Sequence, residues 1–181
     1  MATCSSGSHN IRGKKGLIAV ILNCNFDKRD SLVFRTGADN DLKNMEALAN
    51  LLSYDFQPCE DETKSGVNKF IDDVVKTLND GGYDAFILLV STHGIMISGN
   101  GSNNDHALML KDSKPHDTNG EMNIIFTRDI VAKVKDCPGL ENKLKVFFIQ
   151  ACRGQYSLPV IILTMLAVCT GIHGSTFEFI I

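Results

Sequence analysis

The run Leu17-Ile18-Ala19-Val20-Ile21-Leu22 decides the fold of this chain, because an uninterrupted apolar run of this length is typical of a strand buried on both faces. Similar runs recur at residues 85–90 and 144–149. Strands of this kind form parallel sheets whose two sides are covered by helices. The sequence therefore predicts an α/β fold with a mostly parallel sheet flanked by helices.

Apolar residues at helical spacing lie between these runs. The clearest set spans residues 66–79 and consists of Val67, Phe70, Ile71, Val74, Val75 and Leu78. A helix over 41–52 with Asp39 as its N-cap is also predicted, as is a shorter helix over 127–135. A weaker strand near 54–58 completes the alternation of strands and helices.

Residues 97–121 interrupt this alternation. They are rich in Gly, Ser, Asn and Asp around one apolar run at 107–110. We predict a long surface loop that carries a hairpin strand. Structureless loops of such length are uncommon unless they serve a function.

Composition and charge exclude several classes of protein. The chain has 181 residues, of which 44% are hydrophobic and 22% charged, as expected for one globular domain. A net charge of -3 without a basic cluster argues against nucleic-acid binding. The six cysteines show neither a CxxC pair nor a Cys/His metal spacing, so no disulfide framework, metal or cofactor is expected. Because residues 1–16 lack an apolar leader segment, we expect a cytoplasmic protein.

Two strand ends carry chemically useful residues. The run at 85–90 leads into Ser91-Thr92-His93-Gly94, and the run at 144–149 leads into Gln150-Ala151-Cys152-Arg153-Gly154. Ligands of open parallel sheets bind beyond the carboxyl ends of the strands, so neighbouring strands would bring His93 and Cys152 to one edge.

An imidazole can take the proton of a thiol and make it a nucleophile. The backbone N–H groups of Gly94 and Cys152 could then stabilise an oxyanion. The alternative is a histidine with an ordinary hydrogen bond and an inert buried cysteine.

The sequence Gln-Ala-Cys-Arg-Gly with a histidine 59 residues upstream (152 − 93) is a signature of caspases. Residues 35–41, Arg-Thr-Gly-Ala-Asp-Asn-Asp, look like a second caspase element, Arg-x-Gly-(Thr/Ser)-x-x-Asp. The chain thus resembles the large catalytic subunit of a caspase. This resemblance implies a three-layer α/β fold and a cysteine endopeptidase that cleaves proteins after aspartate through the Cys152/His93 dyad, with a role in apoptosis.

The resemblance also implies that Arg35 and Gln150 bind the carboxylate of the substrate's aspartate. The planar fork of a guanidinium suits this task, because it matches a carboxylate with two hydrogen bonds. The alternatives are a surface arginine and a glutamine that satisfies nearby backbone groups.

We divide the chain into a short arm (1–16), a large-subunit-like domain (17–155) and an apolar tail (156–181). No small subunit is recognisable after Gln155, so we expect an incomplete caspase fold in which the edge of the Cys152-bearing strand is uncovered. One hypothesis is that residues 160–168 fold back onto this edge, and the other is that the tail reflects an alternative transcript end or a truncated gene.

The missing small subunit raises an alternative function, a non-catalytic regulator or decoy of full-length caspases. Its partners would be a caspase small subunit or a full-length caspase in trans. Membrane contact through 158–172 is a less favoured alternative, because the run is shorter than the ~20 residues that a spanning helix needs.

Overall fold

The computed structural model describes residues 13–27, 35, 37–98, 104–114, 122–151, 163–169 and 179–180. These residues form a six-stranded sheet of order β2-β1-β3-β7-β8-β9 and a three-stranded sheet of order β4-β5-β6. The strands are β1 (Gly16–Leu22), β2 (Asp55–Glu60), β3 (Ala85–Ser91), β4 (Gly94–Ser98), β5 (Asn104–Met109), β6 (Ile124–Phe126), β7 (Leu144–Gln150), β8 (Leu163–Cys169) and β9 (Phe179–Ile180).

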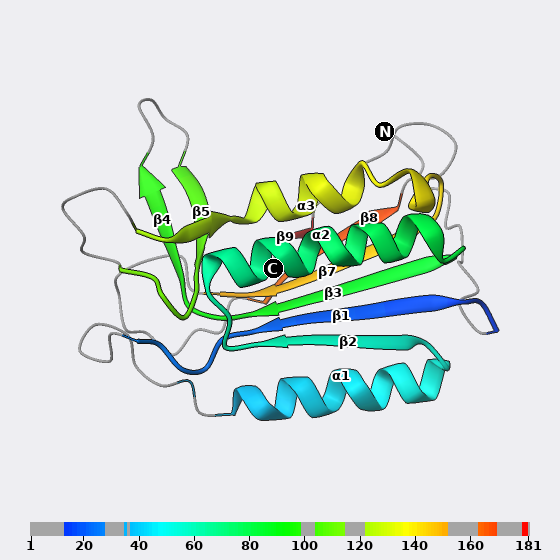
Figure 1. The fold of residues 1–181 in the computed structure, drawn as a ribbon, viewed down its shortest axis with the longest axis horizontal. Helices are drawn as coiled ribbons and strands as arrows, with labels where there is room; N and C mark the ends of the chain where they lie inside the picture. The colour runs from blue at the N-terminus through cyan, green and yellow to red at the C-terminus, as the bar shows by residue number, and fades with distance from the viewer. Residues whose placement is uncertain are drawn as a thin grey trace.

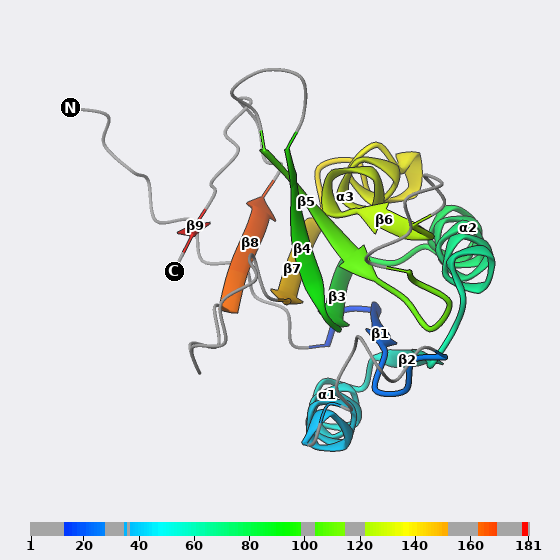
Figure 2. The ribbon, with the colours of Figure 1, turned by 90° about the vertical axis from the view of Figure 1, so that its left-hand side faces the viewer.

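The large sheet is flanked by helices on both faces. Its strands β2, β1, β3 and β7 are parallel. Helix α1 (Ala38–Leu52) covers one face, while α2 (Lys64–Asp80) and α3 (Thr127–Lys135) lie on the other (Figures 1 and 2). This arrangement confirms the predicted three-layer, mostly parallel α/β fold.

Strand β3 is buried on both faces and therefore contributes to two cores. Phe86, Leu88 and Val90 belong to the core beneath α2 and α3. Ala85, Ile87 and Leu89 belong to the core beneath α1. Because side chains alternate along a strand, Ser91 continues the row that faces α1.

The helices begin where local capping allows. Helix α1 starts three residues before the predicted position, and its N-cap is Gly37 rather than Asp39, so the predicted cap was wrong. Gly37 has a φ of 91°, a left-handed conformation that favours glycine. Asp39 instead lies in the first turn, where a carboxylate is favoured by the helix dipole. The predicted bounds of α3 are confirmed.

The segment 97–121, predicted as a loop with a hairpin strand, contains β5 and the end of β4 among its described residues. Strand β4 begins directly after His93 and pairs antiparallel with β5, which pairs in turn with β6. Thr92 Oγ1 donates a hydrogen bond to the carbonyl of Met109, and the amide of Met109 donates to the carbonyl of His93 at 2.8 Å. The small sheet is thereby fastened to the end of β3.

The tail supplies a neighbour for β7. Strand β8 pairs antiparallel with β7 from Leu144↔Cys169 to Gln150↔Leu163. The hypothesis that the tail folds back onto this edge is confirmed for residues 163–168, and residues 160–162 lie outside the described part. Among the described residues, no helix has both the length and the apolar character needed to span a membrane.

The aromatic core beneath α2 and α3 gives a first prediction. The Phe147 side chain is fully buried, and its ring lies 6.5 Å from that of Phe86 in an edge-on arrangement. Phe147→Ala is expected to lower the free energy of unfolding by about 3–5 kcal/mol, because it leaves a cavity. The control is Leu51→Ala, since Leu51 is 76% exposed and its loss should change stability by less than about 0.5 kcal/mol. Urea denaturation of both variants measures the free energy of unfolding. An equal decrease for Phe147→Ala and Leu51→Ala would contradict this packing.

The β7–β8 pairing gives a second prediction. Backbone amides of residues 163–169 are expected to be protected in hydrogen exchange, because paired strands exchange only on opening. Leu166→Pro should abolish that protection, since proline removes an amide donor and fixes φ. The amides of β1, which is separated from β8 by the two strands β3 and β7, serve as the internal control. Rapid exchange of residues 163–169 in the unaltered chain would refute the pairing.

Candidate active site

The carboxyl ends of β3 and β7 lie side by side. Ser91 is paired with Gln150, and the amide of Thr92 donates a hydrogen bond to the carbonyl of Gln150 at 3.1 Å. The two strands are thus neighbours, which is the condition under which His93 and Cys152 were expected at one edge. Figure 1 shows that the small sheet of β4 and β5 stands at this same end of the large sheet.

Arg35 and Gln150, the two residues predicted to bind substrate, both contact the hydroxyl group of Ser91. Arg35 Nη1 donates to Ser91 Oγ at 3.1 Å, and Gln150 Oε1 lies 3.3 Å from the same oxygen. Ser91 Oγ also donates to Asp41 Oδ2, from the first turn of α1, at 2.8 Å. We call Arg35, Asp41, Ser91 and Gln150 the Ser91 cluster. The cluster joins the segment before α1 to the ends of two strands.

His93 follows this cluster in the chain. Its half-buried imidazole lies against the ring of Phe26, with 5.1 Å between ring centroids and 41° between ring planes. Phe26 is itself buried and packs with Met109 and Ile95. Gly94, the predicted oxyanion donor, is the buried first residue of β4. The strand end, the Phe26 ring and the small sheet together limit where the imidazole can lie.

Asp61 fixes the segment that carries Phe26. Its Oδ1 accepts hydrogen bonds from the amides of Cys24 at 2.7 Å and Asn25 at 2.8 Å, and its Oδ2 accepts one from Asn25 Nδ2. Burial alone would raise the pKa of the Asp61 carboxyl, but these hydrogen bonds and the nearby Lys111 lower it overall. The carbonyl of Cys24 accepts from the amide of Arg35 at 3.5 Å, so this segment also contacts the Ser91 cluster.

Cys152, Arg153 and Gly154 lie outside the described residues. The pairing of Cys152 with His93 and the oxyanion donors therefore stay predictions. Two other cysteines have protonated thiols at neutral pH. Burial, together with Asp61 and Asp39, raises the pKa of Cys24 to about 11, and burial with Glu62 and Glu60 raises that of Cys59 to about 12. Neither thiol is suited to nucleophilic attack.

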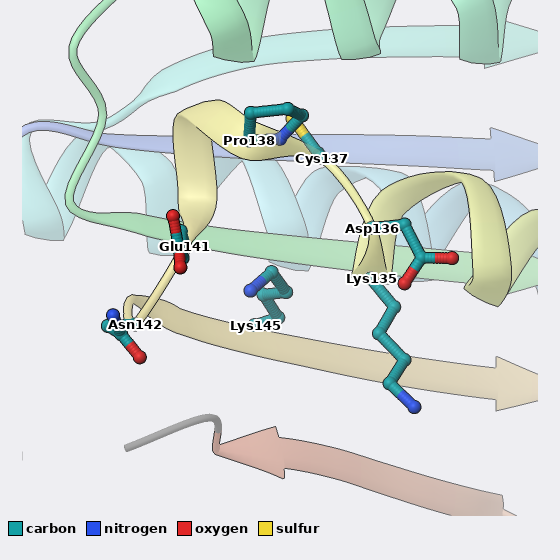
Figure 3. Close-up of a pocket in the computed structure, with 7 residues that line it drawn as sticks. All are labelled: Lys135, Asp136, Cys137, Pro138, Glu141, Asn142 and Lys145. Carbon is teal, nitrogen blue, oxygen red and sulfur yellow. The ribbon is translucent and has the colours of Figure 1, made fainter. Parts of the chain in front are cut away.

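A pocket of about 370 Å³ lies at the opposite end of β7. Its lining includes Lys135, Cys137, Glu141 and Lys145 (Figure 3). Lys145 is fully buried, and its Nζ donates to the carbonyl of Leu140 at 2.6 Å. Burial lowers the pKa of this ammonium group. Because β7 begins here, the pocket is at the amino ends of the strands, away from the edge at which open parallel sheets bind ligands.

The sequence interpretation assigned no role to Ser91, Asp41, Phe26 or Asp61. A polar residue at the end of an otherwise apolar strand was the available signal for Ser91. The signal for Asp41 was its place in the Arg35–Asp41 element. The roles of Phe26 and Asp61 depend on contacts between segments distant in sequence, which no local pattern reveals. In the described part of the chain, no three His, Cys, Asp or Glu side chains gather closely enough to hold a metal ion.

Comparison with known proteins defines the family. The caspase domain family model matches residues 17–176, and the chain therefore belongs to the caspase-domain family. The match includes β8. The predicted domain boundary at residue 155 stays a prediction.

Curated relatives agree with this assignment. The chain is 25% identical over 140 residues to caspase-2 of Gallus gallus, covering 77% of this chain and 29% of the relative. It is 29% identical over 145 residues to caspase-1-A of Xenopus laevis, covering 79% and 36%. It is 30% identical over 145 residues to caspase-4 of Mus musculus, covering 80% and 35%. The chain thus spans about a third of the length of these relatives.

Asp61 gives a prediction about acid stability. Its pKa in the folded protein lies below the ordinary value of 3.8, so the ionised carboxylate stabilises the fold. This contribution is complete above the unfolded pKa and is lost as the pH falls through the folded pKa. Asp61→Asn is expected to lower the free energy of unfolding by about 1–2 kcal/mol at pH 7.

The difference between Asp61→Asn and the unaltered chain should shrink below about pH 4. Denaturation at several pH values measures it, with Asp80→Asn, an exposed carboxylate at the end of α2, as the control. A difference that does not depend on pH would show that the ionised form of Asp61 has no stabilising role.

Proposed function

We propose that this chain is a cysteine endopeptidase that cleaves peptide bonds after aspartate, with Cys152 as nucleophile and His93 as general acid and base. The observation that carries the proposal is the Ser91 cluster, in which Arg35 and Gln150 converge two residues before His93. A guanidinium and a primary amide are donors suited to a carboxylate. Membership of the caspase-domain family supports the same chemistry.

In the proposed reaction His93 takes the proton of the Cys152 thiol, and the sulfur attacks the carbonyl carbon of the scissile bond. The N–H groups of Gly94 and Cys152 stabilise the resulting oxyanion. His93 then gives its proton to the leaving amine, and a thioester remains on Cys152. Water, deprotonated by His93, hydrolyses the thioester and restores the thiol.

Specificity for aspartate comes from Arg35 and Gln150 in this proposal. A hydrogen bond to a charged group contributes about 1.5–3 kcal/mol, which corresponds to about 10- to 100-fold discrimination between Asp and the neutral Asn. The proposed partners are protein substrates, and a caspase small subunit or full-length caspase that completes the substrate groove in trans. A role in apoptosis and a cytoplasmic location belong to the same proposal and rest on the family resemblance alone.

A cleavage assay tests the enzyme proposal. The purified chain, alone and with a separately expressed caspase small subunit, is given fluorogenic peptides with Asp or Asn at the cleaved position. The Asp peptide should be hydrolysed with a kcat/KM about 10- to 100-fold higher, and Cys152→Ala should reduce hydrolysis to background. Cys59→Ala is the matched control, because burial raises the pKa of that thiol to about 12 and its loss should leave hydrolysis intact.

Equal, background-level signals from the unaltered chain and Cys152→Ala under both conditions would contradict the enzyme proposal. That outcome would favour a protein that binds caspases or their substrates without cleaving them.

A further inference from the structure

Ser91 is a polar side chain in an apolar row. It is 0% exposed and follows Ile87 and Leu89 on the face of β3 that packs beneath α1. A buried hydroxyl without hydrogen bonds destabilises a fold, so such groups are almost always paired. Ser91 is paired with three side chains, two from the Arg35–Asp41 element and one from the end of β7.

The Ser91 hydroxyl has a single proton, so it can donate to only one of these partners. Asp41 Oδ2 is the nearer acceptor, at 2.8 Å, whereas Gln150 Oε1 is 3.3 Å away. A carboxylate is also the stronger acceptor, so the proton goes to Asp41. The oxygen of Ser91 then has only lone pairs to offer to Arg35 and Gln150.

Both remaining partners must therefore donate to the Ser91 oxygen. Arg35 does so, because its Nη1 donates to Ser91 Oγ at 3.1 Å. Gln150 satisfies it when its amide is turned so that Nε2 faces Ser91, which exchanges two atoms of nearly equal size. Both donors are then held by one oxygen whose own proton is fixed by Asp41. With the amide in that orientation, Arg35 and Gln150 donate to Ser91, and Ser91 donates to Asp41.

We infer that Ser91 and Asp41 are positioning residues of the aspartate-recognition site, acting on substrate through Arg35 and Gln150. Ser91 sets the place of the guanidinium and the rotational state of the glutamine amide before substrate arrives. This inference rests on the proposed function, since Arg35 and Gln150 recognise the substrate carboxylate only if the chain acts on aspartyl peptides. Preformed donors bind more tightly because less side-chain entropy is lost on binding.

The test uses covalent labelling of Cys152 in the full chain, so that it does not require turnover. Peptidyl chloromethyl ketones carrying Asp or Asn beside the ketone form a thioether with Cys152 as chloride leaves. Iodoacetamide labels the same thiol without a peptide and reports its intrinsic reactivity. Mass spectrometry gives the three rates and confirms the labelled residue.

Ser91→Ala is expected to lower the ratio of the Asp-probe rate to the Asn-probe rate about 5- to 10-fold, as for the loss of one hydrogen bond. Asp41→Asn should lower the ratio in the same direction, because the charged acceptor of the Ser91 proton is gone. Iodoacetamide rates should change by less than about twofold, because this reagent carries no aspartate for Arg35 and Gln150 to bind.

Ser113→Ala is the matched control. Ser113 is also a buried serine, 1% exposed, whose hydroxyl accepts from the amide of Leu110 and donates to the carbonyl of Asn123. Its substitution removes a comparable set of hydrogen bonds outside the Ser91 cluster. The Asp-to-Asn ratio should remain that of the unaltered chain.

The outcomes separate this inference from the proposed function. If the unaltered chain shows no preference for the Asp probe, aspartate recognition fails and the inference fails with it. If the unaltered chain prefers Asp and both variants keep the full ratio, the positioning role is overturned while the proposed function stands. If Ser91→Ala does not fold, Asp41→Asn decides alone, because it preserves the shape of the side chain.

Discussion

The register between β3 and β7 is the constraint on which the candidate site depends. Ser91 lies directly opposite Gln150, and the same register holds along the two strands from the pair Ala85↔Leu144 onward. Because side chains alternate between the two faces of a sheet, a shift by one residue would turn Gln150 away from Ser91. The same shift would move Phe147 out of the core beneath α2 and α3. Apolar burial along the strands thus fixes the polar contacts at their ends.

Two segments outside the strands also determine the geometry of the candidate site. Arg35 reaches Ser91 from the segment that leads into α1, and Asp41 reaches it from the first turn of that helix. The left-handed turn at Gly37 separates these two residues, so the start of α1 determines how both approach the strand ends. On the other side, Asp61 holds the segment that presses Phe26 against His93. The site therefore depends on hydrogen bonds made by carboxylates as much as on the sheet.

The sequence was sufficient for features that repeat with a short period. Apolar runs predicted the parallel strands, and helical spacing predicted α3 to the residue. It was insufficient where structure comes from contacts between distant segments. The residues of β4 form a strand because β5 lies beside them, and the start of α1 depends on the backbone conformation of Gly37. The hydroxyl of Ser91 likewise acquires a role only when Arg35, Asp41 and Gln150 surround it.

The surroundings of Cys24 and Cys59 explain why neither thiol is suited to nucleophilic attack. The carbonyl of Cys24 accepts a hydrogen bond from the amide of Arg35, yet burial and the carboxylates of Asp61, Asp39 and Glu60 raise the pKa of the Cys24 thiol to about 11. The pKa of the Cys59 thiol is raised further, to about 12, because this thiol is buried and close to Glu62 and Glu60. A catalytic thiol requires the opposite surroundings, with an imidazole near it and carboxylates kept away. At the ends of β3 and β7 the Asp41 carboxylate accepts the Ser91 proton, so it takes part in the Ser91 cluster.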